Sequence, residues 1–182
     1  MSGMAIAASS PEDRAREIFI YAESFSHASE TLAKIARNGE EGKQFKSLSL
    51  HAASPVITVD SFALELYLKC LHWIDRKKEP TKLHKYVELF EALSPDAQKS
   101  IAVWYQQILK QNDATVRQHA RDFPKFDYSL KNWLQLSNNT FTRIRYAFEG
   151  KTGDIIYWPF LRVAVRNVIV SSAPGWSWIK NK

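Results

Sequence analysis

Residues 54–76 read SPVITVDSFALELYLKCLHWIDR, and this stretch decides the fold class. Its apolar residues recur at the three-and-four spacing of an α-helix, and they cover two faces of that helix. One face holds Val59, Phe62, Ala63, Leu66, Cys70, Trp73 and Ile74, and the other holds Ile57, Leu64, Leu68 and Leu71. A helix that is apolar on two faces is buried on both. We therefore expect a helix that begins at Ser54-Pro55 and lies at the centre of an all-α domain.

The third side of this helix is a polar stripe, made of Thr58, Ser61, Glu65, Lys69, His72 and Arg76. Glu65 and Lys69 have the spacing of an ordinary ion pair on a solvated helix, which is the simpler interpretation. The alternative is a binding site, because titratable groups at the edge of a buried helix are partly desolvated. On that alternative Glu65, Lys69 and His72 are candidate binding residues, and His72 is also a candidate catalytic residue.

Helices are predicted on both sides of the central one. Ser10-Pro11-Glu12-Asp13 is a helix start signal, and the apolar spacing that follows predicts a helix to about Asn38, stopped by Gly39. Residues 39–53 are predicted to be a polar loop. The expected buried face of this first helix consists of Ile18, Ala22, Phe25, Ala28, Leu32, Ile35 and Ala36.

The second half of the chain predicts a series of shorter helices. The expected segments are a short helix around 86–93, a helix from Ser94-Pro95 to about Gln111, helical spacing over 128–136 and 140–148, and a segment over 159–170. That last segment is rich in β-branched residues, so propensity also allows a strand, although we prefer a helix. We expect one helical domain over residues 10–172, with a tail, 173–182, packed on it through Trp176 and Trp178.

The composition is that of an ordinary folded domain: 182 residues, 45% hydrophobic, 24% charged and 13% aromatic. No apolar run reaches the roughly 20 residues that span a bilayer. Cys70, the single cysteine, lies in an apolar run, so we expect it to be core in a reducing compartment, and the protein to be cytoplasmic. The sequence has no zinc signature, Gly-rich phosphate loop or nucleophile elbow, so we expect no metal and no cofactor.

The net charge of +6 and the pI of about 9.4 permit a polyanion as partner. Residues 112–125 are predicted to be a basic loop in which Arg117, Arg121 and Lys125 contact RNA phosphates, beside His119, Phe123 and Phe126. Simple solvation of this loop is the alternative. A second polar edge gives Arg145 and Tyr146 as candidate binding residues and Arg145 and Glu149 as candidate catalytic residues, although an ordinary salt-bridged face is the simpler interpretation. Arg162 and Arg166 lie one turn apart, and are expected to extend to solvent rather than to bind an anion.

Three segments resemble HEPN-type helical domains of bacteria: SFALELYLKCL at 61–71, KLHKYVELFEALS at 82–94, and SNNTF with RIRYAFE over 137–149. The resemblance implies an up-and-down all-α bundle, commonly a homodimer. Many such proteins are RNases or toxins with Arg, four to six residues, and then His. Here seven residues separate Arg76 from His84, and His84 is followed by Lys85, where many relatives have Asp.

These observations favour the hypothesis that the protein is a non-catalytic dimeric module that binds RNA or a protein partner. The resemblance implies a setting in bacterial stress, phage defence or a toxin-antitoxin pair. One alternative is a metal-independent RNase with a non-standard site, in which Arg145 stabilises phosphate charge and Glu149 or His72 transfers a proton. Another is a ligand-sensing helical bundle.

Overall fold

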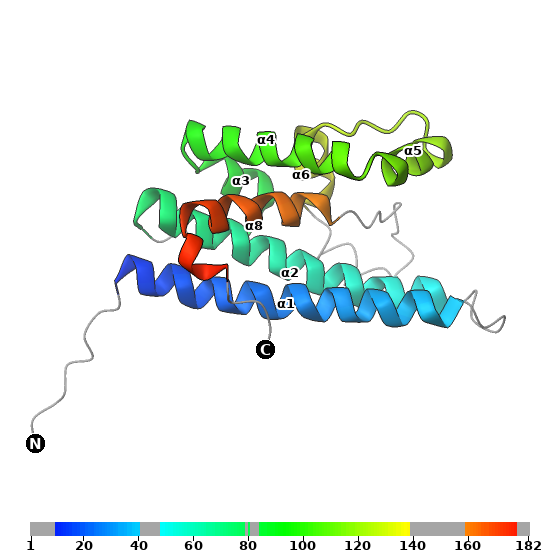
Figure 1. Cartoon of the computed structure of the whole chain (residues 1–182), viewed down its shortest axis with the longest axis horizontal. Helices are drawn as coiled ribbons and strands as arrows, with labels where there is room; N and C mark the ends of the chain where they lie inside the picture. The colour runs from blue at the N-terminus through cyan, green and yellow to red at the C-terminus, as the bar shows by residue number, and fades with distance from the viewer. Residues whose placement is uncertain (1–9, 41–47, 79, 81–83, 139–158, 178–182) are drawn as a thin grey trace, which may run out of the picture.

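The computed structural model describes residues 10–40, 48–78, 80, 84–138 and 159–177, and all regular structure in these ranges is helical (Figure 1). The predicted all-α helical bundle is therefore confirmed. The helices are α1 (Pro11–Glu40), α2 (Leu48–Arg76), α3 (Tyr86–Glu91), α4 (Pro95–Gln111), α5 (Asp113–Asp122), α6 (Leu130–Ser137) and α8 (Phe160–Ser172), followed by a 3-10 turn, η2 (Pro174–Trp176). No helix in the described part of the chain is long and apolar enough to cross a membrane.

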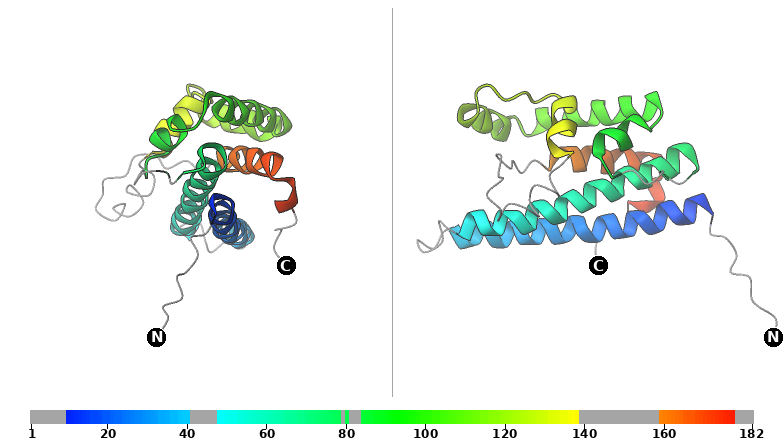
Figure 2. Two further views of the ribbon diagram at one scale, coloured as in Figure 1. Left: turned by 90° about the vertical axis from the view of Figure 1, so that its left-hand side faces the viewer. Right: turned by 180° about the vertical axis from the view of Figure 1, so that it is seen from behind.

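The helices lie in layers, with α1 at one edge, α2 and α8 in the middle, and α4 to α6 at the opposite edge (Figures 1 and 2). α1 and α2 form a long hairpin, and α8 packs between α2 and α4. α2 thus contacts α1, α8 and α3, which confirms its predicted central place. The core contains Phe19 of α1, Tyr67, Leu68 and Leu71 of α2, Ile101 and Tyr105 of α4, and Leu161, Val165 and Ile169 of α8.

The start of α2 differs from the prediction. The helix begins at Leu48, inside the predicted loop, and Pro55 lies within it rather than in its first turn. Proline lacks an N–H, so it removes one helical hydrogen bond and disfavours the helix interior. Packing offsets that cost, because Val56 and Ile57, directly after the proline, are both buried. α1 likewise passes Gly39 and ends at Glu40.

The buried face of α1 differs from the predicted one, since Ala22 alone of the predicted residues with described burial is fully buried. Its buried residues are Ala15, Phe19, Ala22, Glu23, Ser26 and Ser29. Phe25 and Ile35, expected in the core, are exposed. At about 100° per residue, the observed buried face is rotated about the axis of α1 by roughly a quarter of a turn from the predicted apolar face. The prediction failed because half of the buried face is polar, and its side chains meet charged partners from α2 and α8.

The ends of the later helices agree with the sequence signals. Ser94 caps α4 by accepting a hydrogen bond from the backbone N–H of Ala97, as its place before Pro95 predicted. α8 confirms the helical interpretation of the β-branched segment. Trp176 is buried, with its ring 5.5 Å from that of Phe19, so this part of the tail packs on the domain as expected. Trp178 lies outside the described residues.

Candidate functional site

The basic segment after α4 is a helix, α5, and not the predicted loop. Asp113 in its first turn and Arg121 in its last complement the helix dipole. Arg117 also pairs with Asp113 one turn earlier, and this hydrogen bond lowers the pKa of the Asp113 carboxyl. The prediction overlooked these local signals, since the segment carries few apolar residues to reveal a helical period.

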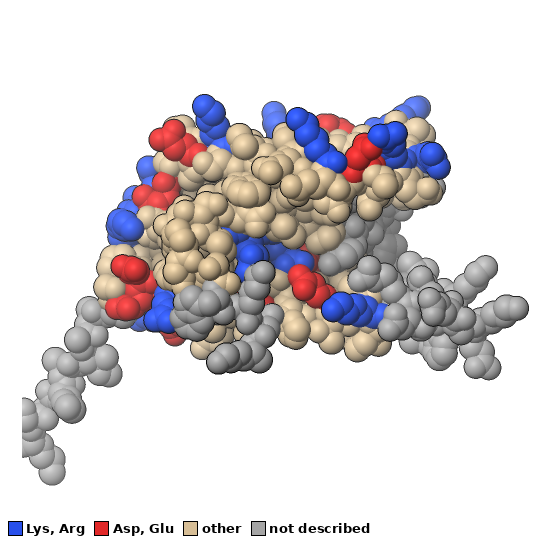
Figure 3. Space-filling view, viewed as in Figure 1, with Lys and Arg blue, Asp and Glu red and all other residues tan. Residues whose placement is uncertain are grey.

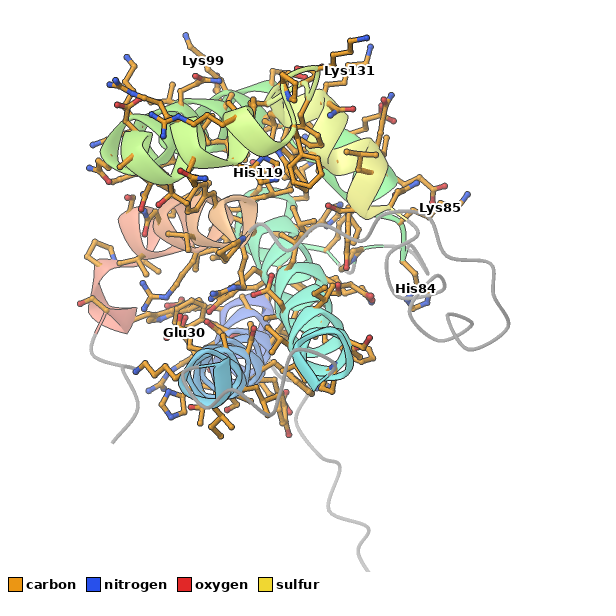
Figure 4. All side chains as sticks on the ribbon, turned by 90° about the vertical axis from the view of Figure 1, so that its right-hand side faces the viewer. Glu30, His84, Lys85, Lys99, His119 and Lys131 are labelled. Carbon is orange, nitrogen blue, oxygen red and sulfur yellow. The ribbon has the colours of Figure 1, made fainter. Side chains whose placement is uncertain are left out.

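An aromatic cluster holds α5 against the chain that follows it. His119 Nδ1 lies 2.6 Å from the hydroxyl oxygen of Tyr128, and its ring stacks on Phe123 at 4.7 Å. Phe126 lies between Tyr128 and Trp133, 5.0 Å from each ring, and Trp133 is buried in α6. Figure 4 shows His119 turned inward beneath α5. Phe123 and Phe126 were both candidates to contact RNA beside the basic residues. Phe126 instead packs within the aromatic cluster, whereas Phe123 remains exposed.

The three predicted cations of this segment are on the surface. The side chain of Arg117 is 72% exposed, and Arg121 and Lys125 are exposed as well. Since helical residues are about 100° apart, Arg117 and Arg121 lie on the face opposite His119. Figure 3 shows blue side chains gathered over α5, with an acidic group among them. We call Arg117, Arg121 and Lys125 the α5 basic face.

The charge around this face is positive but modest. Residues 95–137 contain six basic residues and four acidic ones, an excess of two (6 − 4 = 2) out of the net +6 of the chain. The basic residues are Lys99, Lys110, Arg117, Arg121, Lys125 and Lys131. Lys99 and Lys131 point away from the domain in Figure 4. Attraction for a polyanion at this edge is therefore weak to moderate and strongly salt-dependent.

The polar stripe of α2 divides into two parts with different surroundings. Glu65 lies between Lys69 and His84, with its Oε1 2.6 Å from Lys69 Nζ and 3.0 Å from Nδ1 of the exposed His84. His72, in contrast, is buried, and its Nδ1 lies 3.3 Å from the carbonyl oxygen of Lys78. Burial lowers the pKa of His72. His72 therefore fastens the turn after α2 through the carbonyl of Lys78.

Three of the candidate residues cannot be placed. Arg145, Tyr146 and Glu149 fall in 139–158, outside the described residues, and so does the helical spacing over 140–148. The structure therefore brings together Glu65 and Lys69 on α2, and Arg117, Arg121 and Lys125 at α5. These two groups belong to different parts of the fold, since α2 lies in the middle layer and α5 at the outer edge (Figure 1).

A buried charged network joins α1, α2 and α8, and sequence reasoning missed it. Arg162 is 3% exposed and donates Nε–H to Asp60 Oδ1 across 2.6 Å, while also bonding Ser26 and reaching Glu30 at 3.4 Å. Burial raises the pKa of Asp60, and the adjoining guanidinium opposes that rise. The expectation that Arg162 extends to solvent was therefore wrong.

Arg166 belongs to the same network. Its Nε and one terminal nitrogen donate to the two carboxylate oxygens of Glu23, at 2.6 and 3.0 Å, and Tyr67 donates its hydroxyl to the same carboxylate at 2.5 Å. A usable signal was present in the sequence. Buried charges in a folded protein are paired, so arginines on the apolar α8 required carboxylates, which Glu23 of α1 and Asp60 of α2 supply.

No group of three His, Cys, Asp or Glu side chains within the described ranges is arranged to hold a metal ion. Cys70 is fully buried, and burial raises the pKa of its thiol. Comparison of the chain with protein-family models, with curated proteins and with solved structures finds no match. The proposals below therefore depend on the geometry of the chain itself.

Proposed function

We propose that the protein is a non-catalytic module that binds RNA or a similar polyanion through the α5 basic face. The observation that carries the proposal is the anchoring of α5 by the His119 cluster, which fixes a row of solvent-facing guanidinium groups. Arg117 and Arg121 are one turn apart, about 5 to 6 Å between Cβ atoms. One guanidinium group can bind two phosphate oxygens at once. A fixed helix presents two such groups without the entropic cost of ordering a loop.

The proposal does not include catalysis, because the Arg and His residues do not have the expected spacing or exposure. The spacing of Arg76 and His84 departs from the RNase motif of HEPN-type proteins, and His72 is buried and bonded to a backbone carbonyl. A HEPN-like module in a stress or defence setting remains part of the proposal, and its support is the sequence resemblance together with an all-α bundle, a fold class shared by many unrelated proteins. Cleavage of RNA by the purified protein would contradict it.

The experiment measures RNA binding as a function of salt. Because each phosphate contact releases counterions, the logarithm of the binding constant is expected to fall linearly with the logarithm of the salt concentration. The variant Arg117→Gln, Arg121→Gln, Lys125→Gln should lower the slope by up to about three, one for each lost contact. Glutamine is a good helix former, so the helical content should be unchanged.

A matched variant removes three cations from another exposed place. Arg76, Lys77 and Lys78 lie at the end of α2, which is distant from α5 in Figure 1. Their replacement by Gln lowers the net charge by the same amount, and we expect it to leave most of the affinity. Equal losses in the two variants would mean that binding follows net charge alone, and the α5 basic face would be rejected as a site.

A further inference from the structure

One aromatic ring lies on the surface next to the α5 basic face. Phe123, the residue directly after α5, is 42% exposed. The ring of His119 stacks on it, with the ring centres 4.7 Å apart and the planes 30° from parallel. Since His119 covers one face of the phenyl ring, the exposed area belongs to the other face and to the ring edge. An exposed aromatic face of this kind can receive a second flat ring.

The backbone on both sides holds Phe123 in place. Its N–H donates to the carbonyl oxygen of His119 at 2.8 Å, and its own carbonyl oxygen accepts the N–H of Phe126 at 3.0 Å. The second bond closes a four-residue turn whose second residue is Pro124, where the proline ring fixes the backbone angle φ. His119 is held in turn by the hydroxyl of Tyr128 at 2.6 Å. The phenyl ring therefore needs little ordering when a ligand binds, which lowers the entropic cost of binding.

Two cations of the α5 basic face flank this ring in the sequence. Arg121 precedes Phe123 by two residues and Lys125 follows it by two, and both side chains are exposed. Two residues of extended chain span at most about 7 Å, so the backbone of each cation lies within that distance of Phe123. In a nucleic acid a flat base is attached between two phosphates. The spacing therefore suits a base on Phe123 with a phosphate at each cation.

Charge alone selects weakly among anions at this edge of the domain. Residues 95–137 have an excess of only two positive charges. Asp127, close to the turn, accepts hydrogen bonds from the N–H and the hydroxyl of Ser129, both at 2.8 Å. These bonds lower the pKa of the Asp127 carboxyl, so it stays negatively charged near the cations. Selectivity must therefore come from an uncharged contact, which the exposed ring of Phe123 can supply.

We propose that Phe123 is a stacking platform for a nucleobase, and that the preferred ligand of the α5 basic face is single-stranded RNA. This inference rests on the proposed function, to which it adds the class of ligand. In a duplex the bases are stacked on their neighbours, whereas a single strand can turn one base onto Phe123. The phenyl ring has no hydrogen-bonding group, so it accepts every base and gives little sequence preference.

The test uses the full chain and three RNA probes of equal length: a single strand without self-complementarity, the same strand without its bases, and a duplex. The wild-type chain should bind the base-carrying single strand about tenfold tighter than the abasic strand, the usual scale for one base stacked on an aromatic ring. The salt dependence should be the same for these two strands, because their phosphates are the same. At high salt, where phosphate attraction is screened, the duplex should bind more weakly than the base-carrying strand.

Substitutions at Phe123 separate stacking from charge. Phe123→Leu keeps an apolar side chain, and it should lower the affinity for the base-carrying strand about tenfold, to that of the abasic strand. Its affinity for the abasic strand and the duplex, and its salt slope, should be unchanged. Phe123→Trp keeps a stacking ring and should retain the preference. The matched control is Phe25→Leu, since Phe25 is 37% exposed on α1 at the opposite edge of the domain (Figure 1), and it should bind all three probes like wild type.

The outcomes distinguish this inference from the proposed function. Equal wild-type affinity for the strands with and without bases would overturn the inference, and this comparison needs no substitution, so it decides even if Phe123→Leu folds poorly. An equal loss of affinity in Phe25→Leu, or an equal loss for the duplex in Phe123→Leu, would overturn it as well. In these cases a salt slope that falls in the triple Gln variant still supports the α5 basic face as a phosphate site. Binding of none of the probes would overturn the proposed function and this inference together.

Discussion

Arg162 and Asp60, 102 residues apart in the chain, form a 2.6 Å ion pair that is closed to solvent and joins α8 to α2. Each charge is tolerable in the interior only because the other is present. Arg162→Met should therefore lower the free energy of unfolding by about 3 to 5 kcal/mol, the usual cost of leaving a buried charge unpaired. Urea denaturation measures the change.

The double variant Arg162→Met, Asp60→Leu removes both charges and supplies the control. It should regain most of the lost stability, since well-packed apolar pairs replace buried ion pairs at little cost. If the double variant were as unstable as the single one, the loss would come from packing rather than from the unpaired carboxylate.

Stability should fall in alkaline solution. Burial raises the pKa values of Cys70, Tyr67 and Tyr86 above their ordinary 9.0 and 10.0. The unfolded chain loses these protons above about pH 9 and the folded chain keeps them, so stability is full below that pH and declines above it. Denaturation at a series of pH values should show the decline, and Cys70→Ala should make it shallower. An unchanged slope in that variant would contradict the assignment to Cys70.

Trp176 should contribute to stability although it follows the last long helix. Its ring packs on Phe19 in the core, so Trp176→Ala should cost about 3 to 5 kcal/mol, as for other buried aromatics. Thermal unfolding measures the effect. A change below about 0.5 kcal/mol would place the ring on the surface instead.

The anchoring of α5 can be tested apart from any ligand. Tyr128→Phe removes the hydroxyl that bonds to His119, a loss of about 1 kcal/mol. We expect amide hydrogens of α5 to exchange about fivefold faster in this variant, because the helix opens locally more often. The amides of α4 are the internal reference. Equal acceleration in both helices would mean that the bond stabilises the whole domain.

The sequence predicted correctly those helix ends that depend only on residues within one turn of the end. The Ser94-Pro95 start of α4 needed only a cap and a proline, and both act within one turn. α5 was missed because its stability comes from charge pairs and from His119 bonding nine residues ahead to Tyr128. The start of α2 was wrong because the packing of Val56 and Ile57 outweighs the local preference of Pro55.

The candidate residues were harder to predict than the helices. Arg117, Arg121 and Lys125 are exposed, as expected of the predicted loop, although Arg117 and Arg121 lie on a helix and only Lys125 lies in a turn. His72 looked like part of a solvated stripe because periodicity reports only its own helix, and the turn that covers it comes later in the chain. The Arg162 network depends on three helices far apart in sequence, so no local pattern contains it.

The position of α8 also bears on how the chain reaches its native state. This helix is the last of the long ones in sequence, yet it lies between α2 and α4 and carries both arginines of the buried network. On the ribosome the α1–α2 hairpin is complete long before its ionic partners are synthesised. Until then Glu23 and Asp60 lack the arginines that pair with them in the folded chain, so we expect the α1–α2 hairpin to close fully only after α8 is made. Such long-range closure slows folding and leaves nascent chains dependent on protection from aggregation.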